Sequence, residues 1–102
     1  MSYTLVETDE LRDFTADSPT PTPLLQANQV GVQLLNLSAG QGVGPCQMGH
    51  TVIYYVVEGR GSLRVGDHTS TVRKGSLALV SADDVRAISA DGLLRVLVIQ
   101  QK

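Results

Sequence analysis

The sequence predicts an all-β protein that folds as one barrel or sandwich. The chain contains short apolar runs rich in β-branched residues, separated by glycine-containing turns at regular intervals. This spacing is typical of sandwiches and barrels, whereas βαβ units place a helix between successive strands. With 102 residues, of which 42% are hydrophobic, the chain suits a single domain with a single core.

The expected strands occupy most of the chain after residue 29. Residues 30–37 and 51–57 are apolar and β-branched, which is typical of buried strands. Further strands are expected at 62–65, 69–73, 76–80, 85–89 and 93–100. The glycine-rich residues 39–45 are expected to form a loop. A tight reversal is expected at 59–61, and residues 90–92 are expected to separate the last two strands.

The first 23 residues are expected to form an arm, and residues 24–102 the barrel; together they make one domain, 1–102. A short helix is predicted over residues 9–14, with Thr8 as its N-cap and acidic residues in its first turn. Residues 18–23, SPTPTP, are predicted to be an extended connector. We interpret the acidic residues of the arm as a solvated surface.

Charge, hydropathy and cysteine content exclude several classes of protein. The net charge of −2 has the wrong sign for a domain that binds nucleic acid by neutralising phosphates. No apolar stretch reaches the roughly 20 residues of a membrane helix, and residues 1–13 do not resemble a signal peptide. The single cysteine, Cys46, excludes an internal disulfide and fits a reducing compartment. We therefore expect a cytoplasmic protein with no nucleic-acid or membrane partner.

Residues 40–90 resemble the paired motifs of the cupin superfamily. The glycine, His-x-His, glutamate and glycine positions of the first motif fall on Gly40, Cys46, Met48, Val52 and Gly59. The glycine, Pro-x-Gly, histidine and asparagine positions of the second motif fall on Gly75, Ser81, Asp83, Arg86 and Ala90. The resemblance implies a cupin-like double-stranded β-helix, that is, a jelly-roll barrel. This fold hosts enzymes, storage proteins and ligand sensors.

The positions that hold the metal ion in this superfamily carry unsuitable residues in this chain. The resemblance places Cys46, Met48, Val52 and Arg86 there. A guanidinium group stays protonated and valine has no lone pair to donate. Hard and borderline divalent ions prefer oxygen and imidazole ligands. We therefore predict that the site is degenerate and that the protein holds no metal ion and no other cofactor.

We predict instead that a small organic ligand binds inside the barrel, as small barrels allow. Strand alternation and the motif alignment predict the ligand-binding residues Cys46, Met48, His50, Val52, Tyr54, Val56 and Arg86. Arg86 is expected to anchor an anionic group of this ligand. An equally weighted alternative pairs Arg86 with Asp83, Asp84 or Glu58, or turns it to solvent.

Two other functions remain open. His50 and Tyr54 could transfer protons in a metal-independent isomerase or cyclase. Cys46, Met48 and His50 could instead form a rebuilt site for a soft metal ion such as copper(I).

A homodimer is also expected. Strand alternation places Ile53, Tyr55 and Val57 on the outside of the barrel. A monomer would not leave such an apolar patch exposed. A second copy of the chain is therefore the expected partner.

Overall fold

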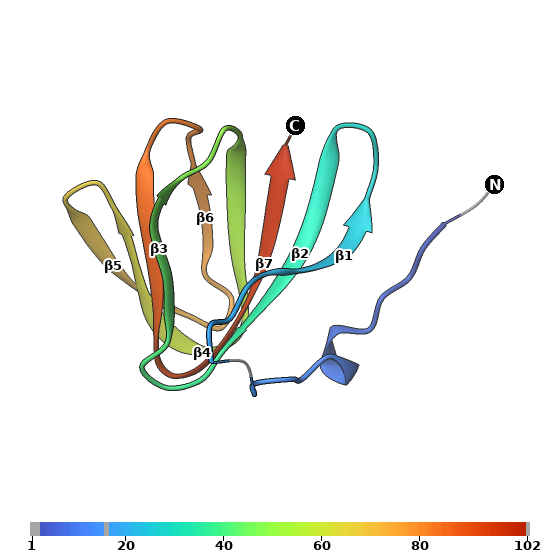
Figure 1. Cartoon of the computed structure of the whole chain (residues 1–102), viewed down its shortest axis with the longest axis horizontal. Coiled ribbons are helices and arrows are strands. Elements are labelled where there is room, and N and C mark those ends of the chain that lie inside the picture. Colours follow the sequence, from blue (N-terminus) through green and yellow to red (C-terminus); the bar gives the residue numbers. More distant parts are fainter. Residues whose placement is uncertain (1–2, 16, 102) are drawn as a thin grey trace.

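The computed structural model describes residues 3–15 and 17–101 and consists almost entirely of strands (Figure 1). One short 3₁₀ helix, η1, covers Thr8–Glu10. The strands are β1 (Thr22–Gln26), β2 (Val30–Leu37), β3 (Gly42–Gln47), β4 (Thr51–Val65), β5 (His68–Arg73), β6 (Leu77–Val80) and β7 (Val85–Gln101). The predicted all-β class is confirmed. Within the described residues, no helix is long and apolar enough to span a membrane.

Two long strands, β4 and β7, run side by side through both walls of the fold (Figure 1). Their antiparallel register extends from Thr51↔Gln101 to Val65↔Arg86. In the first wall, β2 pairs with the C-terminal half of β7, β6 pairs with the N-terminal part of β4, and β1 pairs with β2. In the second wall, β3 pairs with the N-terminal part of β7 and β5 pairs with the C-terminal part of β4. No pairing joins the outer strands of the two walls within the described residues. The jelly roll is therefore not a closed barrel.

The tight reversal predicted at residues 59–61 and the break between strands predicted at residues 90–92 are wrong. Both β4 and β7 continue through these positions, with register shifts at 56–58 and 59–61. Gly59 has a φ of +90°, and a Cβ atom there would lie 1.8 Å from the backbone carbonyl oxygen of Leu93. The glycine therefore permits a bend at which β4 and β7 come very close, a known use of glycine in strands.

Three further predictions about local structure need correction. Strand β3 occupies part of the predicted glycine-rich loop, and β1 begins inside the predicted connector. The helix predicted over 9–14 is only the single turn η1, and its N-cap is Glu7, not Thr8. No residue of η1 is buried, so packing does not offset the cost of nucleating a helix.

The hydrophobic core lies between the two walls. Its buried residues are Leu35, Leu37, Val52, Tyr54, Val56, Leu63, Val72, Val80, Ile88, Ala90, Leu94, Val96 and Val98. Along β4, burial alternates as a strand with one inward face requires. Val52, Tyr54 and Val56 are buried, while Tyr55 between them is exposed.

The arm is held against the outside of the first wall by a buried arginine, Arg95. Its guanidinium group donates to Asn36 Oδ1 (3.2 Å), to Glu58 Oε1 (3.4 Å) and to the backbone carbonyls of Thr8 and Leu11. Asn36 Nδ2 also donates to the carbonyl of Leu11, at 2.7 Å. Backbone carbonyl groups of the arm thus accept hydrogen bonds from side chains of the wall, and these polar contacts fix the path of the arm.

We predict that Glu58→Gln loosens the arm. Arg12 donates two hydrogen bonds to the Glu58 carboxylate, and these contacts lower the pKa of Glu58. This stabilisation is present above the ordinary glutamate pKa of about 4.3. It is lost as the pH falls through the lowered value in the folded protein.

Hydrogen exchange checks this prediction. Backbone amides of residues 8–13 are expected to exchange faster in Glu58→Gln than in the unmodified protein at neutral pH. The difference should shrink at acidic pH, where Glu58 is itself protonated. Asp91→Asn is the control, because it breaks only an exposed pair with Arg60 at 3.9 Å. Equal exchange in all three proteins would contradict the assignment of Glu58 to the arm.

Candidate functional site

A cavity of about 310 Å³ lies between the two walls. Its lining residues are Pro21, Gln33, Leu35, Val43, Cys46, Met48, Tyr54, Arg86, Ile88, Val98 and Gln100. The lining is mainly apolar, with a few polar side chains from both walls. That composition is typical of sites for small molecules, and the volume is at the lower end of their range.

Four of the predicted ligand-binding residues, Cys46, Met48, Tyr54 and Arg86, line this cavity. The other three do not. Val52 and Val56 belong to the core and are 0% and 2% exposed. His50 lies in a bend after β3, which ends at Gln47. The alternation used to place His50 beside Cys46 and Met48 therefore stops before reaching it.

Arg86 is the buried charge of this cavity. It lies near the start of β7, opposite Cys46 of β3, and is 2% exposed. Its Nε donates to the backbone carbonyl of Asp84 at 2.9 Å, and its Nη2 donates to that of Ser81 at 2.7 Å. Its Nη1 is buried and has no hydrogen-bond partner within the described residues. Two of the three nitrogens are therefore held in place while the third is free.

The alternatives considered for Arg86 from the sequence are not what the structure contains. Its contact with Asp84 is to the backbone carbonyl, and the Glu58 carboxylate pairs with Arg12 and Arg95. No ion pair of Arg86 occurs within residues 3–15 and 17–101. A buried charge without a counter-ion costs several kcal/mol by order of magnitude. Arg86 is therefore a buried charged residue of the cavity lining without a counter-ion among the described residues.

The opposite wall contributes a pair of amide side chains, Gln33 of β2 and Gln100 of β7. Gln100 Nε2 donates to Gln33 Oε1 at 3.3 Å, and both side chains line the cavity. The prediction from sequence missed them. The signal was present, because each is an amide in a strand whose other residues are mostly apolar.

The cavity is poorly suited to a metal ion. No group of three His, Cys, Asp or Glu side chains that could hold a metal occurs in the part of the chain that the structure describes. Cys46 and Met48 line the cavity, but His50 does not. The charge of Arg86 in the same lining would repel a cation.

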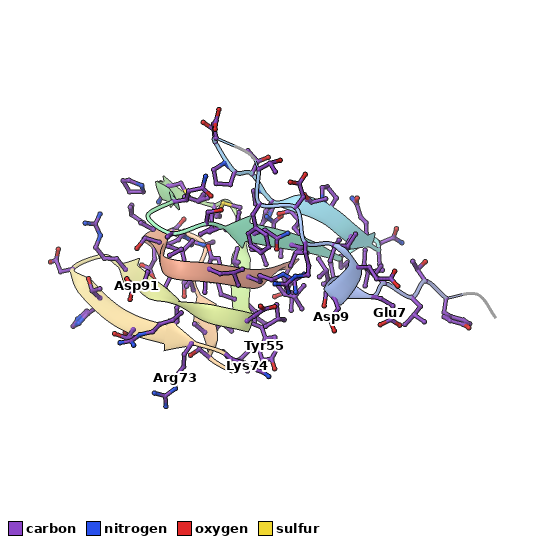
Figure 2. The ribbon with its side chains drawn as sticks, turned by 90° about the horizontal axis from the view of Figure 1, so that it is seen from below. Glu7, Asp9, Tyr55, Arg73, Lys74 and Asp91 are labelled. Atoms are coloured by element: carbon purple, nitrogen blue, oxygen red, sulfur yellow. The ribbon has the colours of Figure 1, made fainter. Side chains whose placement is uncertain are left out.

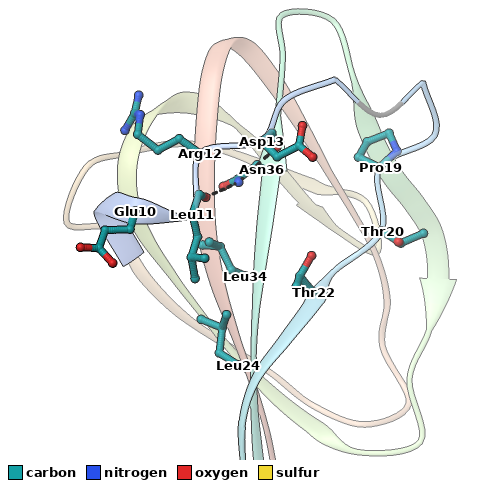
Figure 3. A pocket seen from close by; sticks show the side chains of 10 residues that line it. All are labelled: Glu10, Leu11, Arg12, Asp13, Pro19, Thr20, Thr22, Leu24, Leu34 and Asn36. Atoms are coloured by element: carbon teal, nitrogen blue, oxygen red, sulfur yellow. Dashed lines mark hydrogen bonds between the residues drawn. The ribbon is translucent and has the colours of Figure 1, made fainter. Parts of the chain in front are cut away.

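A second pocket, of about 590 Å³, lies between the arm and the outer side of the first wall (Figure 3). Its lining residues are Glu10, Leu11, Arg12, Asp13, Pro19, Thr20, Thr22, Leu24, Leu34 and Asn36. The amide of Asn36 binds the carbonyl of Leu11, and Arg12 is paired with Glu58. Two of its hydrogen-bonding side chains thus serve to hold the arm, and its described residues contain no buried polar atom that lacks a hydrogen-bond partner.

Comparison with known proteins found a matching family model and solved structures with a similar fold. A family model described as the AraC-like ligand binding domain matches residues 31–99. A solved structure from Thermus thermophilus is similar with a TM-score of 0.87 at 20% identity, covering 95% of each chain. A cupin superfamily protein from Desulfitobacterium hafniense has a TM-score of 0.84 at 17% identity, covering 99% of this chain and 93% of that one. No curated protein matches the chain. The predicted cupin fold is confirmed.

Proposed function

Because the chain belongs to the family of AraC-like ligand binding domains, we propose that it binds a small anionic organic molecule in the cavity between its walls. The observation that carries this proposal is the buried Nη1 of Arg86, which has no partner within the described residues. An anion would compensate the charge and accept a charge-assisted hydrogen bond, about twice as strong as a neutral one. A neutral ligand would leave the charge uncompensated.

The rest of the lining supports an organic body for this anion. Leu35, Val43, Ile88 and Val98 present apolar surface to the cavity. Contact with an apolar ligand would remove this surface from water, at roughly 25 cal/mol per Å². An inorganic ion would leave this apolar surface without an apolar partner.

We propose a binding or sensing role without a metal ion. Tyr54 lines the cavity, but its predicted partner in proton transfer, His50, lies outside the lining. The soft-metal alternative loses His50 for the same reason and places a cation beside Arg86. The cytoplasmic location and the absence of nucleic-acid binding stay predictions from the sequence.

Thermal unfolding tests the proposed anion specificity. Short monocarboxylates are expected to raise Tm, whereas their neutral amides, the matching amines and neutral sugars are not. A ligand at about a hundred times its Kd adds about 2.7 kcal/mol to the free energy of unfolding. For a domain of this size that is a rise of roughly 10 °C or more. Amides or sugars that stabilise the protein as well as carboxylates would contradict the proposal.

We also propose that the exposed face of the first wall binds a second copy of the chain. On this face Tyr55 lies opposite Leu77 and Ile53 opposite Leu79, and the two leucines are 69% and 66% exposed. This forms a contiguous apolar patch. Such patches on soluble proteins mark interaction sites.

Charges beside this patch favour self-association. Figure 2 shows Glu7 and Asp9 on one side of Tyr55, and Arg73, Lys74 and Asp91 on the other. In a two-fold dimer each contact occurs twice, with the two surfaces exchanged. An axis near Tyr55 would therefore bring Glu7 and Asp9 of each copy toward Arg73 and Lys74 of the other.

Light scattering in solution tests the dimer. The unmodified chain is expected to have twice the monomer mass, and Leu77→Lys/Leu79→Lys the monomer mass. Val85→Lys, which changes an exposed apolar residue of the other wall, should remain dimeric. A monomeric unmodified chain would overturn this part of the proposal and leave the ligand site unaffected.

A further inference from the structure

We infer that the ligand is a monocarboxylate with an apolar body and one uncharged hydrogen-bonding group, which the Gln33–Gln100 pair recognises. This inference rests on the proposed function, because it takes Arg86 as the partner of the carboxylate. It adds the identity of the opposite end of the ligand. It also names the residues that select for that end.

The course of β7 places the two polar ends of the cavity on opposite walls. The strand descends along the second wall, bends, and returns along the first wall to the C-terminal end (Figure 1). Arg86 is near its start and Gln100 near its end, and both line the cavity. In β2, Gln33 pairs with Val98, so it lies diagonally beside Gln100 on the same face. A ligand that reaches from wall to wall meets the guanidinium at one end and the amides at the other.

The amide pair is equipped to bind an uncharged group. The hydrogen bond within the pair joins Gln100 Nε2 to Gln33 Oε1 at 3.3 Å, longer than the usual 2.9–3.0 Å. Each amide carries both donor and acceptor atoms. The pair thus keeps an acceptor on Gln100 and a donor on Gln33. A hydroxyl, ketone or amide group of a ligand would satisfy them.

The same lining argues against more highly charged or more polar ligands. Arg86 is the one Lys or Arg residue of the described lining, so a second carboxylate would be desolvated without a cation. A sugar acid would bring several hydroxyl groups against Leu35, Val43, Ile88 and Val98. Each hydroxyl buried without a partner weakens binding.

Calorimetric titration with four acids of matched length tests the inference: an alkanoate, its terminal hydroxy acid, a dicarboxylate and a sugar acid. The hydroxy acid is expected to bind about 2- to 10-fold more tightly than the alkanoate, the effect of one net hydrogen bond. The dicarboxylate and the sugar acid should each bind at least about 10-fold more weakly than the alkanoate.

Variants of the amide pair separate recognition from folding. In Gln33→Leu/Gln100→Leu the alkanoate should bind at least as tightly as the hydroxy acid. Retained alkanoate binding also shows that the variant is folded with Arg86 in place. Gln26→Leu, which changes an exposed glutamine of β1 outside the cavity, should keep the preference for the hydroxy acid.

The outcomes distinguish this inference from the proposed function. Tightest binding of the dicarboxylate or the sugar acid would overturn the inference and leave an anion-binding site. A preference for the hydroxy acid that survives in the double variant would remove the amide pair from recognition. No binding of any of the four acids would contradict the proposed function itself.

Discussion

Arg86→Met is expected to abolish binding of anionic ligands and to leave the free protein at least as stable as before. Removing one partner of a buried charged contact typically costs 2–5 kcal/mol, so affinity should fall by about 30-fold or more. In the free protein the same change removes a buried guanidinium that has no counter-ion among the described residues. Replacing buried ionic groups with apolar side chains of similar volume is often neutral or stabilising, by roughly 1–4 kcal/mol.

The hydrogen bonds lost with Arg86 should not reverse this balance. They go to the backbone carbonyls of Ser81 and Asp84. Both residues are exposed, so water can replace the guanidinium. A residue kept for function at the expense of stability is common at binding sites.

Urea unfolding and titration calorimetry together check the Arg86 prediction. Arg64→Met is the control, because it removes an exposed arginine of β4 outside the cavity. This control should change neither the affinity nor the free energy of unfolding appreciably. If Arg86→Met loses about 3 kcal/mol or more of stability, Arg86 serves to hold residues 81–84 in place and not to bind a ligand.

Gly59→Ala is expected to prevent folding or to destabilise the protein by more than about 4 kcal/mol, a large effect for a point substitution. The added Cβ would lie 1.8 Å from the backbone carbonyl oxygen of Leu93. Relief requires β4 and β7 to separate where both walls meet. Small domains are stable by only about 5–15 kcal/mol in total.

Gly75→Ala is a closely matched control for Gly59→Ala. Gly75 has a φ of +92°, against +90° at Gly59, but no atom lies within 4 Å of a Cβ placed there. Backbone strain alone should cost about 1–2 kcal/mol. Circular dichroism and urea unfolding should therefore show a folded Gly75→Ala and an unfolded or very weak Gly59→Ala. Equal stability of the two variants would contradict the close approach of the strands.

Hydrophobic pattern predicted where most strands lie, because a strand with one buried face repeats every second residue. It could not decide what the glycines do. Gly59 lies just after a long apolar run, and a glycine at such a position can form either a tight reversal or a bulge. Only the position of Leu93 on the neighbouring strand distinguishes the two uses. Strand β1 was missed because it is short and contains Pro23, which local pattern treats as a break.

For similar reasons, only part of the candidate site could be predicted from the sequence. Alternation indicates which side chains face inward, but not how deep they lie. Val52 and Val56 therefore looked like cavity residues although they are core. The position of Arg86 came from the cupin motif spacing, whereas its lack of a partner depends on contacts with distant segments. Gln33 and Gln100 meet only because β2 pairs with β7.

The most direct test of the account is a crystal structure with the tightest-binding monocarboxylate. We predict a carboxylate oxygen within about 3.2 Å of Arg86 Nη1, the upper range of an ordinary N–H···O bond. The body of the ligand should lie between the two walls, against Ile88 and Val98. A ligand bound under the arm or on the outer face of the first wall, with Nη1 still unpaired, would contradict the account.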